Sequence, residues 1–413
     1  MENNIKYQKA MLISVGTGKD VAHGIYFSID SQNPNSVFFI VSDDSKERTL
    51  PRLLEKLKNK KPNLTFEIFE NEEVNDVQKL HRTYLDYIND LLKKGFLKEN
   101  ITVDFTSGTK AMSSALVSAA LFLEVGKLSY IYGDRDKDGR VLSGTERVNS
   151  LYPSAIFSIK KINRFINLFN VFQFESASKI LENEEIHPEY SNIALTLISL
   201  ANVYSAWDKF NFHTAFNALK NIEVKRLREL NLKGKIGNDS KILPILCKNE
   251  LTHEKIYDLY ANAERRYKEG KYDDGMARLY RLLEMIAQLE FKKIFNCPTN
   301  DVKLEHINPK HHQKIKRKYL DSYDKKIKIP LAFTYFLLAD SNNNIGLVFE
   351  ENKMNIKKLL GQRNQSILAH GSTPINKVEF EKMFIFIKDK FLPLLQQNKL
   401  QYNFQFPKIK IKF

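Results

Sequence analysis

In the N-terminal part of the chain, short apolar runs alternate with longer amphipathic segments. Most runs lead into glycine, serine or threonine, a pattern typical of a buried strand followed by a turn. In the segments between them, apolar residues recur at three and four positions, which predicts one buried helix face. Strands that alternate with helices favour a parallel, doubly wound sheet, and so an α/β domain. The predicted strands are 10–16, 37–41, 66–69, 101–105 and 128–132, and the predicted helices are 50–58, 74–94 and 111–125.

The pattern changes after Gly133. Residues 140–151 predict a hairpin arm or a strand that leaves the first domain, and a helical period then covers 162–224. A basic, irregular stretch at 225–250 contains glycines and a proline and marks a boundary. Beyond it the spacing is helical again, and the tail at 401–406 alternates like a strand. The predicted C-terminal helices are 255–269, 272–295, 354–368 and 378–397.

These patterns predict an α/β plus all-α protein in three parts. An α/β domain covers 1–155, a helical connector covers 156–250, and an all-α domain covers 251–413. A chain of 413 residues is long for one hydrophobic core, so several domains are expected.

The net charge of +15, from 64 basic and 49 acidic residues, favours an anionic partner. Nucleic acid or a phosphorylated ligand fits this charge better than a membrane. The stretch 303–328 has nine Lys or Arg against three acids, a local charge of +6. It either guides a nucleic acid or is a solvated loop. Its histidines, His306, His311 and His312, are not expected to form a zinc site.

The remaining composition predicts a soluble cytoplasmic protein. Cys247 and Cys297 form no C-x-x-C pair, so we expect no disulfide framework and no zinc site, which fits a reducing cytosol. The N-terminal residues lack the apolar core of a signal peptide. The longest apolar run, 115–125, contains Ser118 and Glu124 and is too short to cross a bilayer.

Two turns carry the polar groups of a predicted ligand site. One follows the first strand and the other follows the fourth. In a parallel sheet both lie beyond the carboxyl ends of their strands, where ligands bind. Backbone N–H groups, hydroxyls and a lysine suit a nucleotide, although two tight turns with ordinary helix caps would give the same pattern. Neither turn fits a P-loop or G-x-G-x-x-G. The residues are Gly16, Thr17 and Gly18, then Thr106, Ser107, Gly108, Thr109 and Lys110.

A second polar set lies near the C-terminus. If the helix covers 354–368 and stops near Gly371, Arg363 and His370 lie just under two turns apart, on one face. Arginine holds a phosphate with a planar fork, and histidine moves a proton near neutral pH. The pair is a minimal set for cutting a phosphodiester without a metal. A surface Arg and a His that satisfies the last helix carbonyls would look the same.

The turn in Asp104-Phe-Thr-Ser-Gly-Thr-Lys-Ala-Met112 resembles the signature turn of the CRISPR-associated Rossmann fold, called CARF. The turn from Gly16 to Gly18 resembles the first ligand loop of that fold. CARF domains bind cyclic oligoadenylates, usually as dimers with one ligand on the two-fold axis. The resemblance implies a Rossmann-like domain whose two turns bind cyclic tetra- or hexa-adenylate.

Arg363, Asn364 and His370 resemble the R-x(4–6)-H motif of HEPN ribonucleases, and 272–284 is similar to the first helix of their HEPN domains. With the CARF-like domain, the chain resembles the CARF–HEPN accessory ribonucleases of type III CRISPR systems, the Csm6-like proteins and their Cas02710-type relatives. The resemblance implies a homodimeric endoribonuclease that cyclic oligoadenylate activates. It would cut single-stranded RNA non-specifically in antiviral defence, with no metal and no cofactor.

The resemblance also implies a role for each residue. The RNA 2′-hydroxyl attacks its neighbouring phosphate, and Arg363 stabilises the charge that develops. Asn364 positions the pair by hydrogen bonds, and His370 acts as acid, base or phosphate donor. Two such helices meet across the dimer to form one site.

Other functions have less support. There is no G-x-S-x-G elbow, and Asp134 to Gly139 has the wrong register for a calcium loop. A restriction-type nuclease would need a carboxylate set that the C-terminal half does not offer. A ligand-gated nucleic-acid-binding regulator without nuclease activity is the alternative, but it would need a helix-turn-helix. Slow cleavage of the activator by Thr17, Thr109 and Lys110 is a further hypothesis.

Overall fold

The computed structural model describes residues 7–18, 20–135, 137, 141–142, 144–230, 232–368, 371–395 and 403–413. The chain forms two compact units. One contains the residues up to Lys160 with Glu185–Tyr190, and the other contains Lys161–Glu184 with Ser191–Phe413. The helices predicted as connector and C-terminal domain thus lie largely in one unit, and the division into three parts stays a prediction. Among the described residues, no helix is both long and apolar enough to span a membrane.

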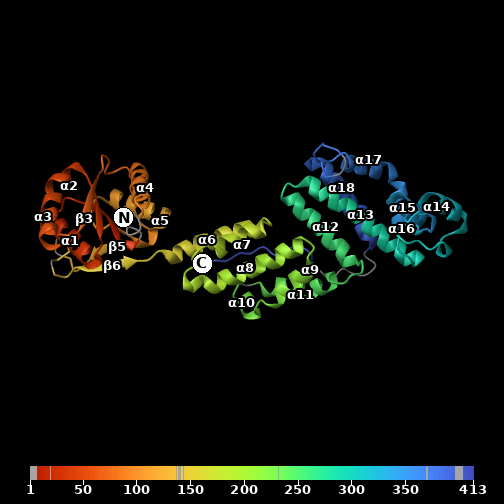
Figure 1. Ribbon diagram of the computed structural model, residues 1–413, viewed down its shortest axis with the longest axis horizontal. Helices are drawn as coiled ribbons and strands as arrows, with labels where there is room; N and C mark the ends of the chain where they lie inside the picture. Colours follow the sequence, from red (N-terminus) through yellow and green to blue (C-terminus); the bar gives the residue numbers. More distant parts are fainter. Residues whose placement is uncertain are drawn as a thin grey trace. The chain divides into compact units, whose positions relative to one another are not determined.

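The first unit is built around a six-stranded sheet in the order β3-β2-β1-β4-β5-β6 (Figure 1). The first five strands are parallel, as predicted, and β6 pairs antiparallel with β5. Of the two interpretations of residues 140–151, the hairpin arm is therefore confirmed for the described strand at 147–151. The strands are β1 (Ala10–Val15), β2 (Ser36–Val41), β3 (Thr65–Glu70), β4 (Ile101–Asp104), β5 (Lys127–Tyr132) and β6 (Arg147–Leu151).

Helices cover both faces of this sheet, and each face has its own core. Successive side chains of a strand point to opposite faces. Leu12 accordingly joins the cluster beneath α4 and α5, whereas Ile13 joins the cluster beneath α1 and α3. The sequence pattern did not predict α1, because its glycine and serines weaken the helical signal. The helices are α1 (Val21–Gln32), α2 (Asp43–Arg48), α3 (Leu50–Lys60), α4 (Val77–Lys93), η2 (Lys98–Asn100) and α5 (Lys110–Phe122).

The described part of the second unit is helical. Two of its helices, α6 and α8, also have residues in the first unit. The elements are α6 (Ser154–Asn170), α7 (Phe174–Glu182), α8 (Pro188–Asp208), α9 (Phe212–Lys220), α10 (Val224–Glu229), α11 (Lys233–Leu246), α12 (His253–Lys268), α13 (Tyr272–Phe295), η3 (Leu304–His306), η4 (Pro309–His311), α14 (His312–Tyr319), α15 (Leu331–Asp340), α16 (Asn344–Glu351), α17 (Lys353–Asn364), α18 (Lys377–Lys390) and η5 (Leu392–Leu395).

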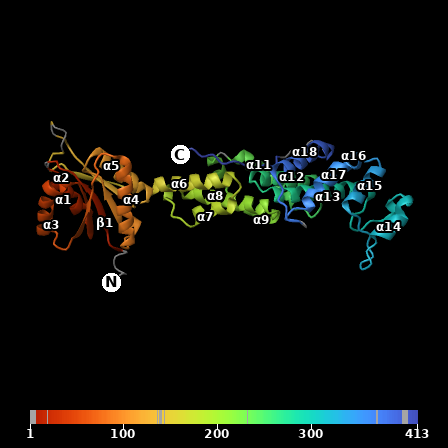
Figure 2. The same cartoon turned by 90° about the horizontal axis from the view of Figure 1, so that it is seen from above.

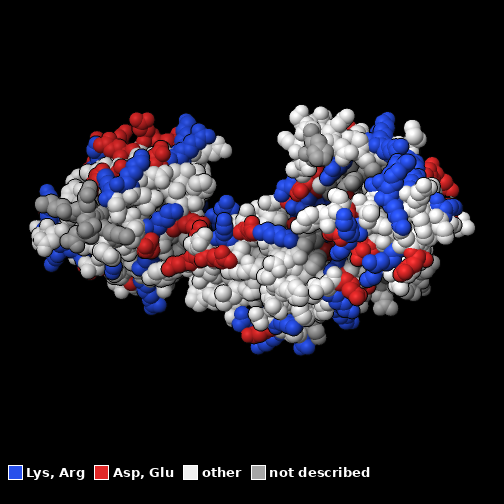
Figure 3. All heavy atoms as spheres, turned by 45° about the vertical axis from the view of Figure 1, so that its right-hand side comes forward, with Lys and Arg blue, Asp and Glu red and all other residues white. Residues whose placement is uncertain are grey.

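The basic stretch 303–328 is folded and is not simply a solvated loop. It contains η3, η4 and α14, and its histidine rings form hydrogen bonds with neighbouring residues. His306 Nδ1 lies 2.6 Å from the Phe295 carbonyl oxygen, and His311 Nε2 lies 3.1 Å from an Asp340 carboxylate oxygen. These contacts hold the stretch against α13 and α15. Figure 3 shows Lys and Arg side chains gathered on the part of the second unit that holds α14 to α17.

The C-terminal tail forms no strand over residues 403–413, so the prediction for 401–406 is wrong where the structure describes it. The tail lies extended beside α6 and α8 (Figure 1, Figure 2). Asn170 exchanges two hydrogen bonds with the backbone of Ile409. The Phe406 ring packs on Trp207 and on the Arg265 guanidinium, which lies 3.7 Å from the ring centroid. Alternating apolar side chains therefore fill gaps between helices, where no strand is available for pairing.

Candidate functional site

The two predicted ligand turns meet because β1 and β4 are neighbours in the sheet, with Ile13 opposite Asp104. Side chains then lock the turns together. The Ser107 hydroxyl accepts the Gly16 N–H at 2.9 Å and donates to the Ser14 carbonyl at 2.6 Å. The Ser14 hydroxyl donates in return to the Ser107 carbonyl. Ser107 is therefore a buried clamp between the turns, rather than an open hydroxyl.

Two glycines permit this close approach. A Cβ atom on Gly16 would lie 2.8 Å from the Gly108 nitrogen, a distance that real side chains do not adopt. Gly108 itself has φ of +99°, in the region that favours glycine. Both positions therefore need glycine for the shape of the site.

Asp104, at the end of β4, is fully buried and ties the second turn to the sheet. Its carboxylate accepts hydrogen bonds from the Ser28 and Ser129 hydroxyls and from the Thr106 N–H. Burial raises the pKa of Asp104, and the hydrogen bonds from these partners oppose that rise. A buried carboxyl with this many donors is held in one orientation, so its role is to fix the turn.

The remaining predicted ligand residues divide into two groups. The Thr106 hydroxyl accepts the Ile131 N–H at 2.9 Å. The Thr109 hydroxyl caps α5 by accepting the Met112 N–H at 3.1 Å, and it donates to the Val74 carbonyl at 2.6 Å. Thr17, Gly18 and Lys110 are exposed, with Lys110 in the first turn of α5. The structure thus leaves Thr17 and Lys110 as side chains open to a ligand.

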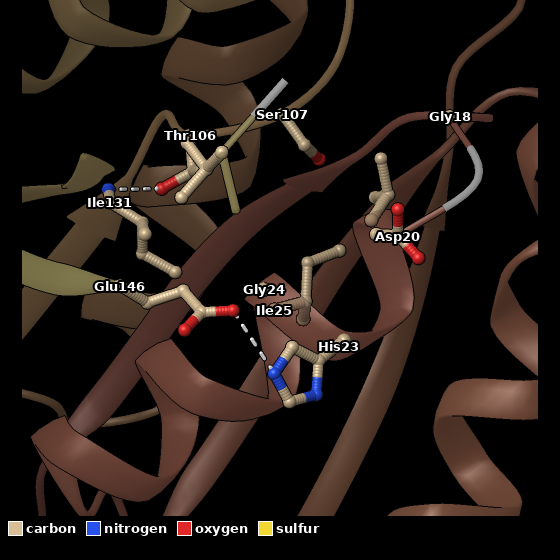
Figure 4. Close-up of a pocket in the computed structure, with 11 residues that line it drawn as sticks. Gly18, Asp20, His23, Gly24, Ile25, Thr106, Ser107, Ile131 and Glu146 are labelled. Carbon is tan, nitrogen blue, oxygen red and sulfur yellow. Dashed lines mark hydrogen bonds and ion pairs between the residues drawn. The ribbon is translucent and has the colours of Figure 1, made fainter. Parts of the chain in front are cut away.

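A cavity of about 260 Å³ lies beside the turns, between α1 and the ends of β4 and β5 (Figure 4). Val21, Ile25 and Ile131 give it apolar walls, and Thr106 and Ser107 contribute to its lining. An apolar cavity with a small number of polar groups in its lining is typical of a small-molecule site. Its size and its place beside the two turns suit a heterocyclic base.

One side of the cavity is closed by a pair that sequence reasoning missed. His23 Nε2 lies 3.2 Å from Glu146 Oε1 (Figure 4). On the other side of the ring, His23 Nδ1 lies 3.1 Å from Lys56 Nζ. Burial alone would raise the pKa of Glu146, but hydrogen bonds from backbone amides and the nearby His23 leave that pKa lowered. No local pattern could have found the pair, because it joins a residue of an unpredicted helix to the residue just before β6, far along the chain.

Arg363 lies at the carboxyl end of α17 in the second unit. Its guanidinium carbon is 4.5 Å from the centroid of the Tyr280 ring on α13, a cation–π distance. Arg363 Nη1 donates to the Asn364 side-chain oxygen at 3.1 Å. Burial, and then the neighbouring Glu284, raises the pKa of Tyr280. From its helical spacing, Tyr280 is expected only to belong to the apolar stripe of α13. In the structure, its ring supports the predicted catalytic arginine.

The predicted continuation of this helix to Leu368 is wrong. α17 ends at Asn364, and the chain turns back so that the Gly371 N–H donates to the Ser366 carbonyl at 3.2 Å. A Cβ atom on Gly371 would lie 2.0 Å from the Gln365 carbonyl oxygen, so the turn needs glycine. A shared helix face therefore cannot relate Arg363 to His370. His370 lies outside the described residues.

No three or more His, Cys, Asp or Glu side chains gather as a metal site within the described ranges. The Asp134 to Gly139 turn falls partly outside those ranges.

Two family models match the helical part of the chain. The model described as the Csm6 6H domain matches residues 157–240, and the model described as the Csm6 HEPN domain matches residues 247–391. The second match includes Arg363, Asn364 and His370. A comparison with curated proteins finds no match.

The chain is also similar in structure to Enterococcus italicus Csm6, solved bound to cyclic hexa-2'-fluoro-hexa-dAMP. The TM-score is 0.59, the sequence identity is 13%, and the match covers 95% of each chain. At this identity the likeness concerns the fold, and it extends over the sheet as well as the helices.

Proposed function

We propose that this chain, a Csm6-like CARF–HEPN protein, is a cyclic oligoadenylate-activated endoribonuclease of type III CRISPR antiviral defence. It cuts single-stranded RNA with little sequence preference and without a metal ion. The observation that carries the proposal is the position of Arg363 and Asn364 at a helix end inside the HEPN match. The cyclic hexa-2'-fluoro-hexa-dAMP bound to Enterococcus italicus Csm6 supports the activator class.

The chemistry follows from the groups around Arg363. The RNA 2′-hydroxyl loses its proton and attacks the adjacent phosphate, and the bond from phosphorus to the 5′-oxygen of the next nucleotide breaks. This leaves a 2′,3′-cyclic phosphate and a protonated 5′-hydroxyl, and negative charge grows on the phosphoryl oxygens during the step. Contact with the Tyr280 ring and the hydrogen bond to Asn364 restrain the guanidinium, so its fork is oriented before substrate arrives. His370 transfers the proton or binds the phosphate.

The proposed active form is a homodimer. One chain supplies one Arg–His pair, and a second copy supplies the other. Asn364 is exposed and Arg363 is only partly buried, so this helix end is accessible to a partner. A single copy would therefore be a poor nuclease.

The proposed activator site consists of Thr17, Gly18 and Lys110, with the adjoining cavity for a base. Lys110 and the N-terminus of α5 offer positive charge to a phosphate. The clamps through Ser107 and Asp104 keep these groups in place when no ligand is bound.

The proposal is tested with purified protein and labelled single-stranded RNA in EDTA. We expect cleavage only when cyclic tetra- or hexa-adenylate is added. His370→Ala should abolish cleavage and retain activator binding, whereas Lys110→Ala should weaken activation with the catalytic residues intact. No stimulation by either ring would contradict the proposal. A preference for duplex DNA in a gel shift would instead favour a regulator.

A further inference from the structure

The hairpin after α14 is a small, well-defined structure that the sequence pattern did not predict. Leu320 and Ile327 form an antiparallel bridge. The Asp321 N–H donates to the Lys326 carbonyl at 2.8 Å, and the Lys328 N–H donates to the Tyr319 carbonyl at 3.0 Å. Residues 321–326 form the turn between these bonds. In Figure 2 the chain beside α14 projects from the helices as a narrow loop.

Side chains fix the tip of this hairpin. Asp321 Oδ1 accepts the N–H groups of Tyr323 and Asp324 at 2.9 and 3.3 Å. Lys328 Nζ pairs with Asp321 at 3.0 Å and with Asp324 at 2.7 Å. The hydrogen bonds from Lys328 lower the pKa of both aspartates. The two acids of the turn are thus held by one lysine.

Tyr323 stands at this tip with 96% of its surface exposed, more than the 80% of Met354 elsewhere in the unit. Single exposed apolar side chains are common on proteins and need no explanation by themselves. Here the ring lies on a turn whose backbone is fixed by Asp321 and Lys328. Binding to the ring therefore costs little additional conformational entropy.

Exposed positive charge lies on the helix before the hairpin and on the hairpin itself. Five exposed cations lie on the second half of α14 and on the hairpin, and none forms an ion pair with any residue that the structure describes. The neighbouring Lys310 differs, because it pairs with Asp340, and Lys314 lies over the rings of Phe333 and Phe336. The five are Lys316, Arg317, Lys318, Lys325 and Lys326.

We propose that residues 316–327 form a stacking platform for single-stranded RNA, with one base on the Tyr323 ring and phosphates on the five cations. An aromatic face needs an unstacked base, which duplex RNA does not offer, and the cations need a polyanion. This inference rests on the proposed function for the identity of the substrate. The platform lies in a part of the chain that lacks the predicted catalytic residues. It would anchor the RNA and take no part in the chemistry.

The experiment measures binding without cleavage. The full chain is titrated into a fluorescent single-stranded oligonucleotide carrying 2′-O-methyl groups, which lacks the attacking hydroxyl. Tyr323→Ala should weaken binding about ten-fold or more, as for loss of one stacked base, and Tyr323→Phe should retain it. Tyr7→Ala, at a position 78% exposed in the first unit, is the matched control and should bind like the parent.

The salt dependence of binding distinguishes the contribution of the charges from that of the Tyr323 ring. The double variant Lys325→Ala/Lys326→Ala should reduce the slope of log affinity against log salt by about 1.4, since each single-strand phosphate contact contributes about 0.7. Tyr323→Ala should leave that slope unchanged. In the cleavage assay Tyr323→Ala should raise KM and spare kcat.

Equal affinity of Tyr323→Ala and the parent, or equal affinity for duplex and single strand, would overturn the inference. Activator-stimulated cleavage alongside such a result would leave the proposed function standing. Conversely, a protein that binds the oligonucleotide through Tyr323 but cuts no RNA would refute the proposed function and support the platform.

Discussion

The ligand turns of the first unit and the arginine helix end of the second are built in different ways. The turns are clamped inside one chain, by the Ser107 hydroxyl to Gly16 and by the Asp104 carboxylate to Ser28 on α1 and Ser129 on β5. Arg363 has one ring beneath it and one amide beside it, at the last turn of a helix. The difference indicates that the proposed sensing site is formed before its ligand arrives, whereas the proposed cleavage site is held by few contacts within its own chain.

Replacing Arg363 tests the less constrained of the two proposed sites and should have the largest effect on activity. Arg363→Ala removes the main charge at the proposed site, and loss of one such group typically lowers kcat about 10²- to 10³-fold. Arg363→Lys should rescue little, because an ammonium lacks the planar fork. The measurement is single-turnover RNA cleavage with saturating activator.

Arg281→Ala is the matched control, since Arg281 lies on α13 and pairs with Glu284 on an exposed surface. It should cut RNA nearly as fast as the parent. Equal losses in the two variants would mean that Arg363 acts through general positive charge.

Each unit also buries a carboxyl group, and the two groups differ in their hydrogen-bond donors. Asp104 has several donors, whereas Asp239 in the second unit accepts from the Tyr204 hydroxyl and has a pKa that burial raises to about 7. This pKa lies above the ordinary value of 3.8, so the folded protein holds a proton that the unfolded chain releases. The contribution of Asp239 to stability is therefore full below about pH 4 and lost as pH rises to about 7.

Asp239→Asn keeps an acceptor for Tyr204 and cannot ionise. We expect its free energy of unfolding to fall less than that of the parent between pH 4 and pH 8, by up to about 4 kcal/mol. Urea denaturation across this range measures the difference. Parallel pH profiles for the two proteins would contradict the raised pKa of Asp239.

Ser107→Ala tests the clamped turns of the first unit and should have a smaller effect, mainly on stability. The Gly16 N–H and the Ser14 carbonyl both lose a buried partner, which costs about 1–3 kcal/mol. Thermal unfolding should show the first unit destabilised, and activator binding should weaken because the turns separate.

Thr17→Ala gives the smallest effect on stability, about 0.5 kcal/mol or less, since Thr17 is exposed. It should nevertheless weaken activator binding, which isothermal calorimetry would measure. If Thr17→Ala lowers stability as much as Ser107→Ala, the division between clamping and ligand-facing residues is wrong.

The fold was largely predictable because its strands are short apolar runs with clear turns after them. β1 to β5, α13 and the order of α/β and all-α parts follow from such local patterns. α1 and the tail escaped prediction because their local signals are weak or ambiguous. The alternation at Phe404 and Phe406 suits a strand equally well, and only the helices around it decide that these rings fill gaps.

For the sites, local sequence is enough to identify the candidate residues at the two turns and at the end of α17. Side-chain chemistry and turn motifs are local properties. Packing between distant segments sets which hydroxyls are already hydrogen-bonded, brings His23 to Glu146 at the cavity, and places Tyr280 under Arg363. It also ended α17 at Asn364, because Gly371 packs on the Gln365 backbone. These outcomes depend on contacts between distant segments, which no spacing within one segment encodes.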